Sequence, residues 1–474
     1  MLQTFKNAWK LPDIRKKILF ALFILLLYRV GTVIPVPFVN ASSFAATFSG
    51  TILDYLNTLS GGSLSTATLF ALGISPYITA SIVIQLLSVA IPALERLAQK
   101  GEEGKKILNN LTRYATVILA VITAIGYYLL LKNNGMLSDE GNTVLGAFVI
   151  VVSYCAGAAL VMWLAEKINE NGFGNGISLI LFANIISVLP SKIISLVDLA
   201  ITGFQGNNAA LWGTLAIVFG VFFILFLLAM VVFSVFVTGS ERRIPVQYAK
   251  RVVDRKMYGG QSTNLPIKLN MSGVMPVIFA SSIISLPATI MALCGVTSRA
   301  SFAECKTFWE GAYLFMSPSG WFYPVLLFIL IIAFSYFYIQ ISFNPVEVAN
   351  NLKKNGGLIP GIRQGRPTAE FIQRVLSKVT LMGAFFLSII AILPIIMVPL
   401  LMNPLVSSIL GSVWAQSGLE SLIGGAYFQS MVSSMTGQFS FGGTSLLIVV
   451  GVALETQRDL EAQLSMRNYK GFLN

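Results

Sequence analysis

The sequence predicts an all-α polytopic membrane protein with ten transmembrane helices, and three observations support this fold class. Of the 474 residues, 55% are hydrophobic and 11% are charged, whereas about 25% are charged in soluble domains. Lys and Arg residues concentrate in alternate loops, a pattern typical of membrane proteins. Ten apolar runs mostly reach the roughly 20 residues that a membrane-crossing helix needs; they cover residues 18–38, 69–92, 114–131, 144–165, 177–190, 211–238, 274–293, 322–342, 379–402 and 428–454.

Two of the runs need individual justification. The first run follows a basic N-terminus, residues 1–17, and such a segment can also be a cleaved signal peptide. Because this run is longer than a typical signal-peptide core and nine more runs follow, we expect an uncleaved first helix. The run at 177–190 is short, so it crosses the bilayer only if it stands steeply, meets a locally thin region, or continues past Pro190.

The placement of Lys and Arg predicts the orientation in the membrane. Nearly all of the 32 Lys and Arg side chains lie at the two ends of the chain or in alternate loops, and the opposite loops hold only Lys132, Lys192, Arg299 and Lys306. Both termini and the large basic loops are therefore expected in the cytoplasm. The net charge of +12 thus gathers on one face, where it can meet acidic lipid, an acidic protein surface or RNA.

The ten runs divide into two halves of five. We place the boundary within residues 203–208, so that an N-terminal half covers residues 1–206 and a C-terminal half covers residues 207–474. Two five-helix halves must face opposite ways across the membrane, which is the arrangement of inverted repeats. The halves share no evident sequence identity, so this prediction concerns topology alone.

The segment between the first two runs, residues 40–67, is too polar to cross the membrane and too apolar for a free loop. We expect a short helix that is broken at Gly61 and Gly62 and lies inside a cavity. Irregular backbone at membrane depth persists only where protein or water surrounds it. A loop on the outer surface is the alternative.

Two cytoplasmic loops, 239–268 and 344–378, are long and basic. Apolar and charged residues alternate in the first, which predicts a hairpin arm that presents cations. Gly and Pro are frequent in the second, which predicts a shaped turn that displays Arg363 and Arg366. We expect both loops to be docking sites, because an ordinary preference for positive charge on the inner side explains their sign and not their length.

The sequence lacks the residues that most enzyme sites require. Residues 101–106 resemble a phosphate-binding loop but have the wrong spacing and no Ser or Thr after the Gly-Lys pair. There is no histidine, no cysteine cluster and no pair of acids within a run, so metal-assisted hydrolysis and carboxylate catalysis lack their ligands. We therefore expect no enzyme activity, no cofactor and no metal.

Of the three cysteines, one is expected to serve packing and the other two could form a disulfide. Cys155 lies within the fourth run, where a small packing residue is expected. Cys294 and Cys305 lie in the outer loop after the seventh run. These two cysteines form either a disulfide or two free thiols, and the sequence leaves both alternatives open.

Ion-coupled transport is disfavoured but not excluded. Transporters usually carry Asp, Glu, Lys or His at mid-membrane, because the coupling ion needs a charged or titratable ligand. The ten runs hold almost no such residue, although carbonyl and hydroxyl oxygens can bind Na⁺. A passive conduit that another component drives is the favoured interpretation.

Short motifs along the whole chain carry a family resemblance. They are Arg-Val-Gly-Thr at 29–32, Ile-Pro-Val-Pro at 34–37, Ser-Gly-Gly-Ser-Leu-Ser at 60–65, Leu-Gly-Ile-Ser-Pro-Tyr-Ile-Thr-Ala-Ser-Ile at 72–82, Gly-Asn-Gly-Ile-Ser at 174–178, Arg-Arg-Ile at 242–244, Tyr-Ala-Lys-Arg at 248–251, Gly-Val-Met-Pro at 273–276, Asn-Pro at 344–345, Gly-Ile-Arg at 361–363 and Gly-Thr-Ser-Leu-Leu-Ile at 443–448. Through them the chain resembles the SecY family, the channel subunits of bacterial protein translocases. It departs from the family at Gln364, where Pro is usual, and at Leu181, where Ile is common.

The resemblance implies four groups of functional residues around a central pore. A ring of aliphatic side chains at the waist would be Ile74, Ile78, Ile177, Leu181, Ile278 and Ile448. A plug at about 56–66 would include Leu56, Asn57, Leu59, Ser60, Gly61, Gly62 and Leu64. A lateral gate would pair Thr79 with Leu286, and a docking surface for the driving partner would use Arg242, Arg243, Lys250, Arg251, Arg363 and Arg366.

The resemblance also implies a function and partners. The chain would pass secretory polypeptides across the bacterial cytoplasmic membrane, recognise their signal sequences and release transmembrane segments sideways into lipid. The SecA motor ATPase or a translating ribosome would drive it, and SecE-like and SecG-like membrane subunits would accompany it. An ion-coupled transporter of a small solute is the alternative, followed by a membrane-embedded enzyme.

Overall fold

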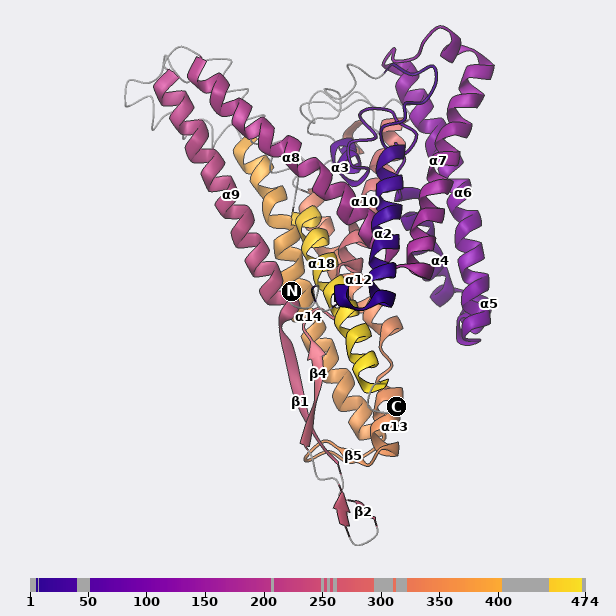
Figure 1. The fold of residues 1–474 in the computed structure, drawn as a ribbon, viewed down its shortest axis with the longest axis vertical. Helices are drawn as coiled ribbons and strands as arrows, with labels where there is room; N and C mark the ends of the chain where they lie inside the picture. Colours follow the sequence, from indigo (N-terminus) through magenta and orange to yellow (C-terminus); the bar gives the residue numbers. More distant parts are fainter. Residues whose placement is uncertain are drawn as a thin grey trace.

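The computed structural model describes residues 6, 8–40, 52–205, 209–248, 251–253, 256–258, 262–293, 310–312, 322–402 and 443–470, and each of the ten predicted runs overlaps a helix (Figure 1). The main helices are α2 (Pro12–Gly31), α3 (Ile52–Leu59), α4 (Ser75–Ala90), α5 (Pro92–Gln99), α6 (Glu102–Asn133), the 3-10 turn η2 (Glu140–Asn142), α7 (Val144–Asn171), α8 (Gly176–Gln205), α9 (Ala209–Gly239), α10 (Met275–Leu293), α12 (Phe322–Ser342), α13 (Pro345–Lys354), α14 (Arg366–Met402) and α18 (Gly443–Lys470). The strands are β1 (Glu241–Tyr248), β2 (Arg251–Val253), β3 (Lys256–Tyr258), β4 (Ser262–Lys268) and β5 (Gly357–Leu358).

Helix lengths agree with a multi-pass membrane protein. Within the described residues, six helical segments are long and apolar enough to cross a bilayer, in α6, α7, α8, α9, α12 and α14. Shorter apolar helices lie in α4 and α10. The fold is therefore an all-α polytopic membrane protein, and the number of ten spans stays a prediction.

Two helices differ in extent from the apolar runs that predicted them. Helix α8 does not stop at Pro190 but continues to Gln205, which is one of the three routes that the sequence left open for this short run. Helix α14 begins at Arg366, well before the apolar run at 379. The predicted loop 344–378 is consequently helical at both ends, and only residues 355–365 form the turn between α13 and α14.

The helices pack around one extensive apolar core. Helix α4 contacts α6 and α10, helix α10 contacts α12 and α18, and α18 contacts α8, α9 and α14. Buried side chains from α2, α4, α7, α8, α10, α12, α14 and α18 form a single cluster. On the outer surface of α2, Leu22, Phe23 and Leu26 are more than half exposed, as expected for side chains that face lipid.

The two basic loops meet in one small sheet. Strand β1 pairs antiparallel with β4, from Glu241 opposite Lys268 to Gln247 opposite Ser262. This hairpin confirms the prediction for the first loop. Strand β5 of the second loop adds to the other edge of β1. Figure 1 shows the hairpin projecting from the lower end of the molecule, where α13 and the C-terminus also lie.

Candidate functional site

The segment between α2 and α4 forms a short helix and a glycine turn. Helix α3 ends at Leu59, and the backbone then turns through positive φ at Gly61 (70°) and Gly62 (89°). The Asn57 side chain holds this turn by accepting a hydrogen bond from the Ser65 N–H at 2.9 Å. The helix therefore breaks where the sequence predicted, because glycine adopts left-handed backbone without steric cost.

This segment is enclosed rather than spread on the surface. Leu53, Leu59 and Leu64 are each at most 7% exposed, and Ser60 and Ser63 are buried beside them. The three leucines belong to the same apolar cluster as the surrounding helices. The alternative of an outer surface loop is therefore wrong for the described part, residues 52–67.

Buried side chains that sequence reasoning did not single out hold the segment by its main chain. The Tyr127 hydroxyl donates to the Leu64 carbonyl, and the Tyr154 hydroxyl donates to the Ala67 carbonyl at 3.2 Å. The two rings also meet edge to face, with their centroids 5.1 Å apart. Because the acceptors are backbone carbonyls, no motif in the plug sequence marks them. The one available signal was the presence of tyrosines within apolar runs, where a hydroxyl needs a partner.

The six predicted ring residues gather in one apolar cluster. Ile74 and Ile78 at the start of α4, Leu181 on α8, Ile278 on α10 and Ile448 on α18 are each at most 4% exposed. Ile177 is partly buried and packs against the same cluster. Leu53, Leu59 and Leu64 of the plug segment are also members. The structure thus brings together residues that lie up to 374 positions apart in the sequence, whereas their closure into a ring stays a prediction.

The two predicted gate residues line the same groove. Thr79 on α4 and Leu286 on α10 face a mostly apolar groove with about 700 Å³ of space, part of which is open to the outside. The groove lies between α4, α6, α10 and the plug segment; its lining is Leu53, Leu56, Leu64, Ala71, Leu72, Ser75, Pro76, Thr79, Leu119, Thr123, Tyr127, Ser285 and Leu286. The structure therefore joins the gate pair to the plug segment in one site.

Three of the predicted docking arginines lie on the hairpin arm, residues 239–268. Arg242 and Arg243 are exposed on β1, Arg251 begins β2, and Lys250 lies outside the described residues. The Arg243 guanidinium pairs with Glu241 at 2.7 Å. At the base of this arm, partial burial and then the nearby Arg458 lower the pKa of Lys268.

The second basic turn is held by main-chain acceptors and leaves its arginines outside. Arg363 and Arg366 are both exposed, and Arg366 pairs with Glu370 at 3.1 Å. The Gln364 side chain donates to the Gly357 carbonyl at 3.2 Å, and Thr368 donates to the Arg363 carbonyl at 2.7 Å. Gln364, where the chain departs from the family pattern, thus ties the turn to strand β5.

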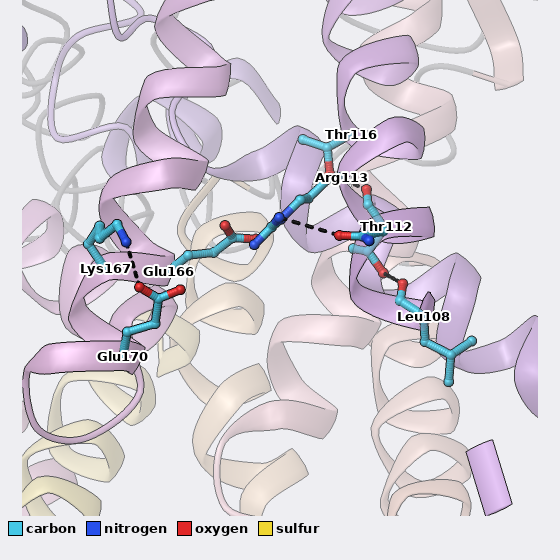
Figure 2. Close-up of polar contacts among 8 residues, drawn as sticks. Leu108, Thr112, Arg113, Thr116, Glu166, Lys167 and Glu170 are labelled. Carbon is cyan, nitrogen blue, oxygen red and sulfur yellow. Dashed lines mark hydrogen bonds and ion pairs between the residues drawn. The ribbon is translucent and has the colours of Figure 1, made fainter. Parts of the chain in front are cut away.

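An ion pair that the sequence did not predict braces α6 against α7. Figure 2 shows Arg113 reaching from α6 to Glu166 of α7, and the Nε–Oε1 distance is 2.8 Å. The Glu166 side chain is 16% exposed and that of Arg113 43%. Directly after Glu166 on α7, Lys167 pairs with Glu170 at 2.6 Å, and this second pair is more exposed. The Arg113–Glu166 pair therefore joins α6 to α7 through a partly buried contact.

The described residues offer no candidate metal site and only one of the three cysteines. Among them, no group of three or more His, Cys, Asp and Glu side chains could hold a metal ion. Cys155 is partly buried within α7, where the sequence predicted it. Cys294 and Cys305 lie outside the described residues, so their pairing stays open.

Comparisons with known proteins point to one family. The SecY family model matches residues 68–457. The protein translocase subunit SecY of Streptomyces scabiei is 40% identical over 487 aligned residues, and that of Streptomyces coelicolor is 41% identical over 488. Both matches cover the whole of this chain and the whole of the relative.

Solved structures share the fold at lower identity. One described as the structure of a protein-conducting channel has a TM-score of 0.58. Another has a TM-score of 0.56, and its description states that the plug domain of SecY stabilises the closed state of the translocation channel and maintains a membrane seal. Sec61 in a canine ribosome-channel complex has a TM-score of 0.55. Each is 16% identical and aligns with 96% of both chains. These likenesses concern the fold.

Proposed function

The chain belongs to the SecY family, and on that premise we propose how its parts work as a protein-conducting channel. Its relatives are protein translocase subunits, and structures that share its fold are protein-conducting channels. It is a multi-pass membrane channel for polypeptides. The alternative of an ion-coupled transporter finds no support in these comparisons, and the family is one of channels rather than enzymes.

The observation that carries the proposal is the common burial of the ring and plug residues. In our proposal Ile74, Ile78, Leu181 and their partners form an apolar neck. Branched aliphatic side chains offer no hydrogen bonds to water, so a narrow neck of this kind dewets and blocks ions. The buried plug segment, residues 52–67 in its described part, closes one side of that neck. Both barriers are soft enough to yield to a passing chain.

The groove between α4 and α10 supports a lateral exit. Thr79 and Leu286 line it from opposite helices, beside the plug. We assign this groove to apolar segments that leave the channel for lipid. A Leu-rich segment gains a few tenths of a kcal/mol per residue in the bilayer, whereas each charge loses about 3 kcal/mol. A separation of α4 from α10 therefore sorts segments by composition.

The cytoplasmic arm would receive the driving partner. The exposed Arg242, Arg243, Arg363 and Arg366 offer cations to an acidic surface of a SecA-like motor or to ribosomal RNA, whose phosphates attract basic loops in a salt-dependent way. Solved Sec61 and Ssh1 channels of similar fold are ribosome complexes. We infer that both termini face the cytoplasm, that the membrane is the cytoplasmic one, and that SecE-like and SecG-like subunits complete the assembly. The division into halves at residues 206 and 207 belongs to the same proposal.

Reconstitution tests the function directly. The full chain, purified with whichever small membrane subunits accompany it, would be placed in proteoliposomes with a motor ATPase, ATP and a secretory precursor. Precursor should become protected from external protease only when motor and ATP are both present. If precursor stays fully accessible while vesicles that contain an established translocase protect it, the proposed function is wrong. Uptake of a small solute along an ion gradient would favour the transporter.

A further inference from the structure

One buried amide lies where the plug segment, α2 and α8 meet. Asn184 is 0% exposed. On α8, Leu181 follows Ile177 by four residues and Asn184 follows Leu181 by three, so all three lie on one face of the helix. Leu181 and Asn184 are therefore about one turn apart, and the Asn184 amide contacts the plug segment at the Leu59 carbonyl.

The amide closes the end of the plug helix. The N–H groups after α3 bond to the carbonyls of Leu56, Asn57 and Thr58, and the Leu59 carbonyl is left for another donor. Asn184 Nδ2 donates to that carbonyl at 2.7 Å. An uncapped helix carbonyl in an apolar interior is costly, so the plug depends on this donor while it is seated.

The same amide is tied to α2. Asn184 Nδ2 also donates to the Tyr28 hydroxyl at 2.9 Å, and Arg29 Nη2 donates to the adjacent Ala183 carbonyl at 2.9 Å. Tyr28 is itself 0% exposed and stacks on Phe70, with ring centroids 5.3 Å apart. Both amide protons are therefore used. A flipped amide would set its oxygen against the Leu59 carbonyl, which fixes the orientation.

Gly61 fits against this amide without room for a side chain. A methyl group at Gly61 would lie 2.9 Å from Asn184 Oδ1 and 3.1 Å from a guanidinium nitrogen of Arg29. Oδ1 is buried and has no hydrogen-bond partner in the described part of the chain. Gly62, also at positive φ, has nothing within 4 Å of such a methyl group. The plug thus bonds to the amide at the Leu59 carbonyl, and Gly61 leaves no room for a side chain beside it.

We propose that Asn184, positioned by Tyr28 and Arg29, is a polar latch that holds the plug closed and sets how strong a signal sequence must be to open the channel. The proposal rests on the proposed function. The Asn184 amide binds the plug through the main-chain carbonyl of Leu59. This hydrogen bond can therefore stabilise the plug only while the plug is in its closed position. Asn184 is a positioning residue, since it acts on the passing chain through the plug.

Replacing the amide tests the latch. Asn184→Leu keeps a similar size and removes both donors, so resting conductance of the purified complex in planar bilayers should rise about tenfold, the effect of one or two net hydrogen bonds. A precursor with a defective signal sequence should also cross more readily in proteoliposomes. Unchanged conductance and unchanged passage would overturn the latch. If the unaltered channel passes no intact precursor, the proposed function fails instead, because conductance still reports on the latch.

A pair of glycine variants tests the latch even if Asn184→Leu does not accumulate. Gly61→Ala and Gly62→Ala suffer the same backbone strain, but only the first presses on Asn184. Gly61→Ala should raise conductance more than Gly62→Ala does. In an Asn184→Ala background, which lacks Oδ1, the difference between the two should shrink to what the contact with Arg29 leaves. Equal effects in the unaltered background would contradict the proposal.

Discussion

The plug segment and the hairpin arm, residues 239–268, both connect helices, yet different forces hold them. Buried side chains grip the plug by the carbonyls of Leu59, Leu64 and Ala67, and its leucines join the main core. Strand pairing shapes the arm, while Arg242 and Arg363 stay exposed. The comparison teaches that enclosure and uncharged hydrogen bonds hold the region that we propose as the seal, whereas the region that we propose for docking keeps its charges available to a partner.

Immobilising the buried region should have the largest effect. Thr79→Cys together with Leu286→Cys places two thiols on opposite sides of the groove, and a disulfide requires their Cα atoms to come within about 7 Å. Oxidation should stop secretion through the double variant, and reduction should restore it. Each single-cysteine variant is the control. Failure of the pair to crosslink at all would separate these residues and contradict the gate assignment.

Reversing a charge on the exposed arm should have the next largest effect. Arg363→Glu puts a repulsive charge at the tip of the second turn, so motor-driven export should fall at least tenfold while the protein remains inserted. Lys354→Glu, on neighbouring α13 and also exposed, makes the same change in charge in the same basic loop but away from the tip of the turn. Export rates in membrane vesicles measure both. Wild-type export through Arg363→Glu would remove this turn from the docking surface.

The sequence predicted the helices and the hairpin, but it did not predict the pairing of β5 or the contacts of Asn184, and each outcome has a physical reason. Hydrophobic run length located the helices because crossing a bilayer imposes it, and the hairpin followed from alternation within 239–268. The pairing of β5 with β1 has no signature in the sequence. It involves two residues of β5 that bond through the main chain, and such bonds need no particular side chains. Asn184 escaped notice because its partners, Tyr28 and Leu59, are far away in the sequence and one of them is a carbonyl.

The gate and ring residues were identified from the resemblance to the SecY family, because hydrophobic and charge patterns in the sequence do not mark them. Thr79 and Leu286 share no local signal; the resemblance paired them, and both line one groove in the structure. The extension of α8 past Pro190 was one of several open routes, because helix context decides whether a proline is tolerated. The Arg113–Glu166 pair joins residues 53 positions apart, a separation that no local charge pattern predicts.

Removing the brace between α6 and α7 should have the smallest effect. Glu166→Gln leaves the Arg113 guanidinium without its carboxylate, but that side chain is 43% exposed and can reach water. We expect a loss of about 1 kcal/mol in the free energy of unfolding, measured by thermal denaturation in detergent. Glu170→Gln, in the exposed pair next to it, should change stability less. A larger loss for Glu170→Gln would show that burial does not set the strength of these pairs.

The conductance of ring variants tests the central claim, that an enclosed apolar neck seals the channel. Ile278→Asn and Ile448→Asn place an amide where the neck must stay dry, and hydration of that amide favours a wetted pore by a few kcal/mol, on the order of the cost of burying an unpaired polar group. Ile331→Asn on α12 is the control, since Ile331 is 0% exposed and belongs to the same cluster without being a predicted ring residue. Resting conductance in planar bilayers should rise at least tenfold in both ring variants and stay unchanged in the control. Unchanged conductance in both ring variants, or an equal rise in Ile331→Asn, would mean that the constriction lies elsewhere and that these isoleucines serve only packing.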